Sequence, residues 1–215
     1  MLLSRIFNKN LFIVLAMISL TGCSVNPATG NKSFTGLMSL KDEIRIGREE
    51  HKKILKAFGG RYQDIAIGNY VNNIGNRLAA NSELPNIKWT FTVLNSPVIN
   101  ALALPGGYVY VTRGLMALAS NEAELAGVIA HEIGHVTARH TAQRYSSSML
   151  AGGVSMAASI FLGSSAGDLA KFASRAALQS YSRKQEFEAD TLGVRYLSRG
   201  NYNTKSMASF LSKLR

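Results

Sequence analysis

The chain has 215 residues, of which 47% are hydrophobic and 17% charged. This composition excludes a disordered protein and allows one well-buried domain. The formal net charge of +11 falls to +9 without residues 1–22, because that stretch holds two basic residues and no acidic one. Lysines and arginines are scattered without a dense basic run, so we expect no nucleic-acid partner and a basic surface beside an anionic membrane.

The first 23 residues resemble a bacterial lipoprotein signal. A short basic region precedes the uncharged run 11–20, which is too short to cross a bilayer and is typical of a signal peptide. Cys23, the single cysteine, excludes an intramolecular disulfide. It ends the stretch Leu20-Thr21-Gly22-Cys23, which predicts removal of residues 1–22 and attachment of lipid, palmitate included, to Cys23. An ordinary signal peptide or a membrane anchor is the alternative.

Several acyl chains on one cysteine would make the anchoring stable, because a single chain gives only marginal binding at ~0.8 kcal/mol per buried CH₂. Ser24, rather than an aspartate, follows the cysteine. By resemblance to bacterial lipoproteins, this predicts an outer-membrane lipoprotein that faces the periplasm.

The next stretch, 24–39, is rich in Gly, Ser, Asn and Thr without periodicity. We expect residues 23–39 to form a tether and 40–215 to form the domain. A capping box at Ser39 predicts a helix to about residue 58, and a second helix is predicted over 63–80. His51 on the first helix has no histidine or cysteine near it in sequence, so we expect a surface side chain rather than a ligand.

From residue 88 onward, apolar residues recur at every second position instead of at helical spacing. Residues 88–93 alternate as a half-buried strand does, and the runs 100–104 and 108–111 flank Pro105-Gly106-Gly107 as a hairpin. A free edge of such a sheet could bind a peptide in extended form, or the sheet could simply bury Trp89 and the tyrosines. A turn at residues 113–114 and a short helix over 115–119 are expected to follow.

The motif His131-Glu132-Ile133-Gly134-His135 lies in a segment predicted as one helix over about 121–145. His131 and His135 are four apart and share a helix face, so their imidazoles can hold one zinc ion. Glu132 is close enough for its carboxylate to reach a water on the same metal, the H-E-x-x-H arrangement of metalloproteases. A chance pattern on an ordinary helix is the alternative, and the surrounding helical periodicity disfavours it.

Residues 146–167 carry no charge, which raises the question of a transmembrane segment. Seven serines and four glycines among these 22 positions argue against insertion. We therefore expect a small-residue helix or mobile loop beside the site, with a membrane span as the alternative.

Two acids downstream, Glu186 and Asp190, are four apart on a helix predicted from about residue 181 through 197. A metal held by two histidines needs a third ligand, and Glu186 is the best candidate. Asp190 could accept a hydrogen bond from the free N–H of a ligating imidazole. Glu188, rotated about 200° from Glu186, is expected to point elsewhere. A solvated acidic face is the alternative.

Three blocks together resemble the gluzincin peptidases related to the CAAX prenyl protease: NALALPGG at 100–107, HEIGH at 131–135 and SRKQEFEAD at 182–190. With the lipoprotein signal, the chain is most similar to the bacterial outer-membrane branch, the LoiP-like metalloproteases. The likeness covers nearly all of the mature chain. It departs from the family after the third ligand, where members carry a histidine- and proline-containing segment and this chain has no histidine beyond residue 140.

The resemblance implies one Zn²⁺ per chain, held by His131, His135 and Glu186, with Glu132 as general base and Asp190 as support. It implies an α+β, mainly α, zincin-like domain with an active-site helix, a small sheet with an edge strand, and a second helix that carries a metal ligand. The substrate-facing edge would comprise Asn100, Ala101, Leu102, Ala103, Pro105, Gly106 and Gly107.

The implied function is a periplasmic, membrane-anchored zinc endopeptidase that degrades misfolded or misassembled envelope proteins in extended form. The alternative is a chaperone-like lipoprotein with latent proteolysis, partnered with outer-membrane protein assembly components. A structural zinc domain is disfavoured because such sites usually use four protein ligands, often cysteines, and need no glutamate like Glu132. Three residues remain unranked as the oxyanion partner: Tyr181, Arg183 and Tyr202.

Overall fold

The computed structural model describes residues 23–26, 28–35, 38–152 and 181–213. The helices are α2 (Leu40–Ala57), α3 (Ile65–Ala79), α4 (Arg113–Leu118), α5 (Glu122–Thr137), α6 (His140–Gly152), α9 (Arg183–Arg199) and α10 (Lys205–Ser212). The strands are β1 (Cys23–Val25), β2 (Lys32–Phe34), β3 (Thr90–Leu94), β4 (Ala101–Leu104) and β5 (Tyr108–Thr112). The expected α+β, mainly α fold is confirmed. Among the described residues, no helix has both the length and the apolar character needed to cross a membrane.

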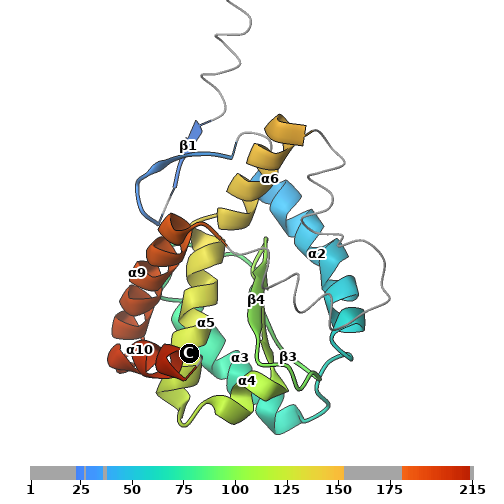
Figure 1. The fold of residues 1–215 in the computed structure, drawn as a ribbon, viewed down its shortest axis with the longest axis vertical. Coiled ribbons are helices and arrows are strands. Elements are labelled where there is room, and N and C mark those ends of the chain that lie inside the picture. The colour runs from blue at the N-terminus through green and yellow to red at the C-terminus, as the bar shows by residue number, and fades with distance from the viewer. Residues whose placement is uncertain (1–22, 27, 36–37, 153–180, 214–215) are drawn as a thin grey trace, which may run out of the picture.

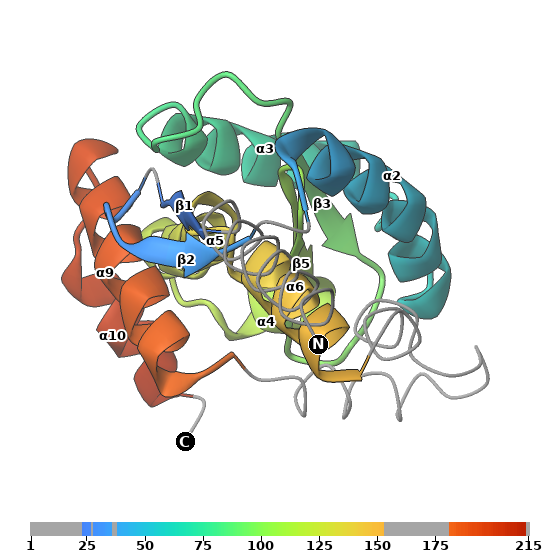
Figure 2. The ribbon, with the colours of Figure 1, turned by 90° about the horizontal axis from the view of Figure 1, so that it is seen from above.

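The three-stranded sheet has the order β3-β5-β4, with β3 parallel and β4 antiparallel to β5. The predicted hairpin is therefore confirmed, and Gly106 and Gly107 turn it with φ of 79° and 91°. β4 is an outer strand of this sheet, on the side where α5 lies. Figure 1 shows the sheet standing between α5 and α2, and Figure 2 shows the same order from above.

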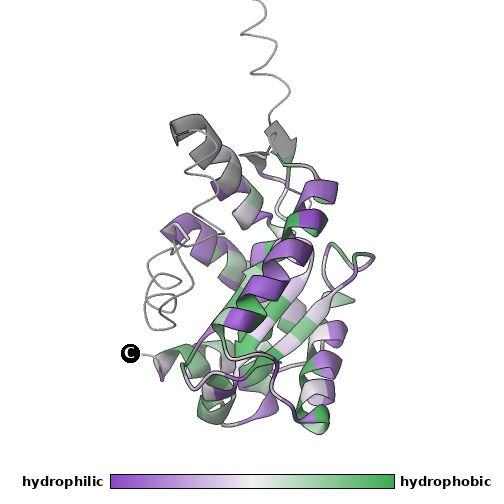
Figure 3. Ribbon diagram, turned by 90° about the vertical axis from the view of Figure 1, so that its right-hand side faces the viewer, coloured by the Kyte–Doolittle hydropathy of each residue, from purple (hydrophilic) through white to green (hydrophobic). Residues whose placement is uncertain are grey.

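Both faces of the sheet are covered, so the expectation of a half-buried strand over 88–93 is wrong. Phe91 and Val93 pack in the larger core with residues of α3 and α5, whereas Leu94 packs with residues of α2. Thr92, which alternation assigns to a solvent face, is only 2% exposed because α2 covers that face. Figure 3 views the molecule from the α2 side and shows hydrophilic residues along the outside of this helix, with the hydrophobic sheet behind it.

Short-range signals fix where the helices begin. Ser39 and Asp42 form the predicted capping box of α2, and Ser182 and Gln185 form another at α9. The side chain of Asn121 caps α5 by accepting from the N–H of Glu124. The turn expected at residues 113–114 is wrong, because the side chain of Thr112 accepts from the Leu115 N–H and starts α4 at Arg113.

The single helix expected over 121–145 is also wrong. The chain leaves α5 at Ala138 and passes through Arg139 at φ 56°, a left-handed conformation, before α6 begins at His140. The Arg139 side chain is held from outside, by the Glu43 carboxylate at 2.6 Å and the Met38 carbonyl at 2.7 Å. These distant contacts stabilise the break between the two helices.

Residues 23–26 and 28–35, expected as part of a tether, lie against the helical body (Figure 2). β1 and β2 pair antiparallel, and buried Asn26 donates from Nδ2 to the carbonyl of Ala138 at 2.9 Å. This part of the predicted tether therefore contacts the domain. The domain boundary at residue 40 stays a prediction, and residues 1–22 and 153–180, with most of the uncharged stretch, lie outside the described residues.

Candidate metal centre

Three side chains converge where α5 crosses α9. Nε2 of His131 lies 2.9 Å from Nε2 of His135 and 3.3 Å from Oε2 of Glu186, and the His135–Glu186 distance is 3.9 Å. Ligand atoms on a tetrahedral metal with bonds of ~2.1 Å are about 3.4 Å apart. The three donor atoms thus fit around one such metal, and they are the ligands that the sequence predicts.

A glycine permits this close approach of the two helices. A Cβ on Gly134 would lie 2.9 Å from the Ala189 carbonyl oxygen and 3.1 Å from its Cα, so any larger residue would push α9 away. Ala189 lies between Glu186 and Asp190 on α9, facing α5. The small residue inside the His131–His135 motif therefore lets both acids reach the histidines.

The electrostatics favour a cation at this point. Burial lowers the pKa of His135 well below its usual value, which keeps its imidazole in the neutral, metal-binding form. Burial would also lower the pKa of His131, but hydrogen bonds to Asp190 and Glu186 outweigh it and raise that pKa to about 10. Burial raises the pKa of Glu132 to about 7, a value suited to a general base near neutral pH.

Asp190 orients His131, as predicted. Its Oδ1 lies 2.9 Å from Nδ1 of His131, so this ring nitrogen donates a hydrogen bond to the carboxylate. Nε2, which faces Glu186, is then the nitrogen that a metal would bind in place of its proton. Glu186 and Asp190 are four residues apart and therefore lie on one side of α9. Asp190 contacts Nδ1 of the His131 ring, and Glu186 contacts Nε2 of the same ring.

His135 is oriented by a residue that the sequence analysis did not single out. Nδ1 of His135 lies 2.9 Å from Nδ1 of His140, and Nε2 of His140 lies 3.3 Å from Oε2 of Glu188. His140 is fully buried, and Glu188 also accepts from the Asn31 amide at 3.5 Å. Glu188 does point away from the ligand cluster, but it reaches the second histidine through His140. The sequence signal that could have identified His140 is its position only five residues after His135.

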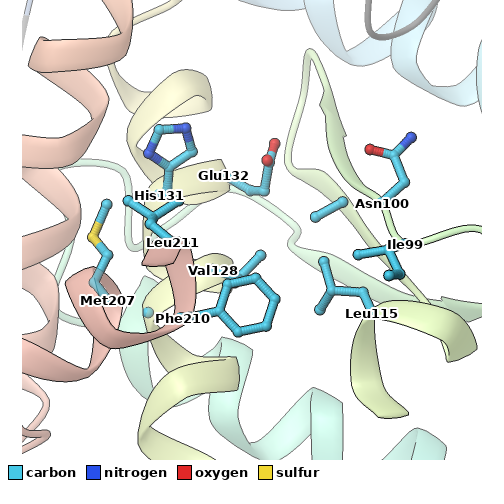
Figure 4. A pocket seen from close by; sticks show the side chains of 11 residues that line it. Ile99, Asn100, Leu115, Val128, His131, Glu132, Met207, Phe210 and Leu211 are labelled. Atoms are coloured by element: carbon cyan, nitrogen blue, oxygen red, sulfur yellow. The ribbon is translucent and has the colours of Figure 1, made fainter. Parts of the chain in front are cut away.

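Glu132 lines a cavity of about 220 Å³ beside the metal ligands (Figure 4). Of the predicted substrate-facing block, Asn100 and Ala101 line the same cavity. Leu102 packs with the core beneath α2, and residues 105–107 are buried in a turn whose backbone lies against α2. The structure thus brings the start of β4, rather than the whole block, to the site.

Among the three oxyanion candidates, Tyr181 lies at the site, with its ring stacked 3.9 Å from that of His135 and its hydroxyl 3.0 Å from Thr141 Oγ1. Burial raises the pKa of Tyr181, so its hydroxyl stays protonated. Arg183 is exposed, and Tyr202 donates to Glu122 at 2.8 Å, away from the ligands.

His51 differs from the surface position expected for it. It is half-buried, with Nδ1 2.7 Å from the Tyr110 hydroxyl, and its ring packs against the rings of Tyr108 and Tyr110. Burial lowers the pKa of His51, and the side chain lies outside the ligand cluster. It therefore contributes to packing between α2 and β5.

Comparison with known proteins agrees with this geometry. The chain is 29% identical over 197 residues to "Mitochondrial metalloendopeptidase OMA1" of Schizosaccharomyces pombe, covering 87% of this chain and 56% of the relative. It is 32% identical over 187 residues to the "Beta-barrel assembly-enhancing protease" of Yersinia pestis, covering 82% of this chain and 38% of the relative. It is 33% identical over 186 residues to the putative protease of that name in Vibrio cholerae, covering 80% of this chain and 38% of the relative.

This chain therefore spans less than two thirds of the length of each of these relatives. A family model described as "Peptidase family M48" matches residues 68–215, which include His131, Glu132, His135 and Glu186. Since this match covers more than half of the sequence, the chain belongs to peptidase family M48.

Proposed function

We propose that this protein is a zinc-dependent endopeptidase that cuts polypeptides bound in extended form. The observation that carries the proposal is the convergence of His131, His135 and Glu186 on one point beside Glu132. Two imidazoles and one carboxylate form a donor set that zinc accepts in catalytic sites, where a fourth position stays open. When bound, one zinc ion per chain supplies Lewis acidity that makes water a stronger nucleophile and polarises a peptide carbonyl.

The protein's own residues perform the proton transfers. Glu132 takes the proton from the attacking water and later delivers it to the leaving amine. Asp190 holds His131, and His140 holds His135, so the ligands keep one orientation during the reaction. The outer strand β4, whose first residue lines the cavity with Glu132, offers backbone groups to an extended substrate.

The proposed setting is protein quality control in the cell envelope. The lipoprotein signal ending at Cys23 supports an outer-membrane lipoprotein of the LoiP-like branch that faces the periplasm. The names of the bacterial relatives describe a protease that enhances β-barrel assembly, which supports misfolded or misassembled envelope proteins as substrates. Outer-membrane protein assembly components are the corresponding proposed partners.

The test is zinc content and casein cleavage measured together on three proteins. Wild type should bind one zinc per chain and cleave casein. Glu132→Gln should keep the zinc and lose cleavage by orders of magnitude, because only the base is removed. Glu186→Ala should contain well below one zinc per chain. Unchanged casein cleavage by Glu132→Gln at equal zinc content would refute the mechanism.

The outer position of β4 in the sheet also favours a second function, as an assembly factor that binds β-strands along β4 with proteolysis latent. The two functions differ in whether they need Glu132. Rescue of a deletion phenotype by Glu132→Gln would support the assembly factor. Failure of this variant to rescue, at wild-type expression, would support the peptidase.

A further inference from the structure

The chain joins the body of the domain directly after Cys23, the proposed point of lipid attachment. Three residues later, Asn26 is 2% exposed and donates from Nδ2 to the Ala138 carbonyl at 2.9 Å. Ala28 is also buried, and its carbonyl accepts from Nη1 of Arg195 at 3.0 Å. Three residues of extended chain span only about 10 Å. Lipid on Cys23 would therefore bring a bilayer within about 10 Å of this end of the domain.

This end of the domain consists of the β1–β2 hairpin, the break between α5 and α6, and the first turns of α2 and α9. Arg139 in the break contacts Glu43 of α2, and His140 contacts Glu188 of α9. Asn31, between the two hairpin strands, also donates to Glu188. Figure 1 shows β1, α6 and the start of α2 at the same end of the molecule. A bilayer at the lipid attachment point would face these elements.

Large apolar side chains are exposed on three of these elements. They are Val25 of β1, 61% exposed, Leu40 and Ile44 of α2, 48% and 38% exposed, and Phe187 of α9, 74% exposed. Single exposed apolar residues are ordinary on a protein surface, whereas several at one end mark an interaction site. Beside a lipid attachment point, such side chains can enter the layer between the headgroups and the acyl chains.

Unpaired basic side chains accompany the apolar ones. Lys41 is the second residue of α2, and Arg183 and Lys184 are the first two of α9. All three are exposed, and among the described residues no carboxylate pairs with them. The nearest acid on α2, Asp42, pairs with Arg45 at 3.6 Å. The end of the domain that faces the bilayer thus carries free positive charge, which anionic headgroups attract.

We propose that the four apolar and three basic side chains named above form a docking face for an anionic phospholipid bilayer, the bilayer face. The inference rests on the proposed lipid anchor at Cys23 and goes beyond it. An anchor alone leaves the domain free to turn, whereas docking fixes its orientation. Without lipid, the bilayer face would bind weakly and reversibly, so the anchor is still needed. Because Glu188 links this face to the ligand His135 through His140, docking keeps the metal centre close to the membrane.

The test is the rate at which an acetylating reagent modifies each lysine of the lipidated protein, measured by mass spectrometry. The protein is anchored in vesicles of phosphatidylcholine, with or without phosphatidylglycerol. At low salt, phosphatidylglycerol should slow the modification of Lys41 and Lys184 about tenfold, because the docked face is covered. At 1 M salt the Debye length falls to ~3 Å, and the difference should disappear.

Lys56 and Lys205 are the internal controls. Both are exposed, Lys56 lies in the last turn of α2, and Lys205 begins α10 at the opposite end of the molecule (Figure 1). Their rates should be the same on both kinds of vesicle. Equal rates for all four lysines on protein that stays anchored would overturn the bilayer face while leaving the lipid anchor intact. Protein that does not stay on the vesicles would contradict the anchor and the face together.

A matched pair of variants locates the face. Phe187→Ser removes the most exposed apolar side chain of the face and should speed the modification of Lys41 on anionic vesicles about threefold. Ile65→Ser removes a side chain that is 81% exposed at the start of α3 and should leave the Lys41 rate unchanged. Equal rates in the two variants would contradict the assignment. Protection that rises with protein density rather than with phosphatidylglycerol would assign the face to a second copy of the chain and overturn docking to the bilayer.

Discussion

Nδ1 of His135 lies 2.9 Å from Nδ1 of His140. The other ring nitrogen of His140, Nε2, lies 3.3 Å from the Glu188 carboxylate. Because Nε2 of His135 faces His131 in the ligand cluster, its Nδ1 carries the proton and donates to His140. His140 then donates from Nε2 to Glu188. A carboxylate of α9 therefore holds each imidazole of the cluster: Asp190 contacts His131 directly, and Glu188 reaches His135 through His140.

The first prediction concerns this contact. His140→Leu removes the acceptor while keeping most of the volume, and should weaken zinc binding about 10–100-fold. His140→Gln should retain most of the affinity, because its amide oxygen can accept from His135. Competition with a chromophoric chelator measures the affinities, and circular dichroism checks the fold. If His140→Leu binds zinc as tightly as wild type, His140 only fills space.

The sequence could not place His140 at the site. In one continuous helix, His135 and His140 would be about 140° apart and would point in different directions. They meet because the chain breaks at Arg139, whose side chain is held by Glu43 and the Met38 carbonyl. These partners are about a hundred residues away in sequence, so no local pattern predicts the break.

Features set by near neighbours were predicted well. The cap at Ser39 depends on a residue three positions away, and the spacing of His131 and His135 needs only a helix. The alternating strand over 88–93 was recognised, but its burial was not. Whether a second layer covers a sheet depends on where α2 packs, which alternation within the strand does not record.

The second prediction tests the lipid anchor. Cys23→Ala should abolish incorporation of labelled palmitate and release the protein from membranes, because Cys23 is the single cysteine. Ser24→Asp is the matched control, since it keeps the cysteine and should retain the label while shifting the protein to the inner membrane. Labelling and fractionation of membranes measure both. Label that persists in Cys23→Ala would refute the lipoprotein proposal.

The third prediction is an acid-dependent loss of stability. Hydrogen bonds from Lys213, from the Ser120 N–H and from Ser209 lower the pKa of Glu124 from 4.5 to about 2. A carboxyl whose folded-state pKa is depressed stabilises the protein above its unfolded pKa and loses that contribution as the pH falls from about 4.5 toward 2. Glu124→Gln should therefore be less stable than wild type at pH 7, and the difference should shrink over this range.

Urea midpoints at pH 7, 4 and 3 give the comparison. Glu49→Gln is a suitable control, because Glu49 pairs with Arg45 at 3.3 Å on the exposed face of α2 and such pairs contribute ~0–1 kcal/mol. A difference between wild type and Glu124→Gln that stays constant from pH 7 to 3 would contradict the assigned pKa.

The fourth prediction compares two helical glycines. Gly134→Ala would place a Cβ 2.9 Å from the Ala189 carbonyl oxygen, so α9 must shift and carry Glu186 away from the histidines. We expect a destabilisation of ~1–3 kcal/mol from overpacking and a weaker affinity for zinc. Gly68→Ala, in α3, has nothing within 4 Å of its new Cβ and should instead stabilise the protein by ~0.5–1 kcal/mol.

Chemical denaturation and zinc titration of the two variants distinguish these effects. Both substitutions add the same methyl group and raise helix propensity equally. The difference between their free energies of unfolding therefore isolates the contact between α5 and α9. Because the acids on α9 reach His131 only when the helices are this close, stability and zinc affinity should fall together in Gly134→Ala. A Gly134→Ala protein as stable as Gly68→Ala, with wild-type zinc affinity, would show that the helices tolerate a wider separation than the site geometry requires.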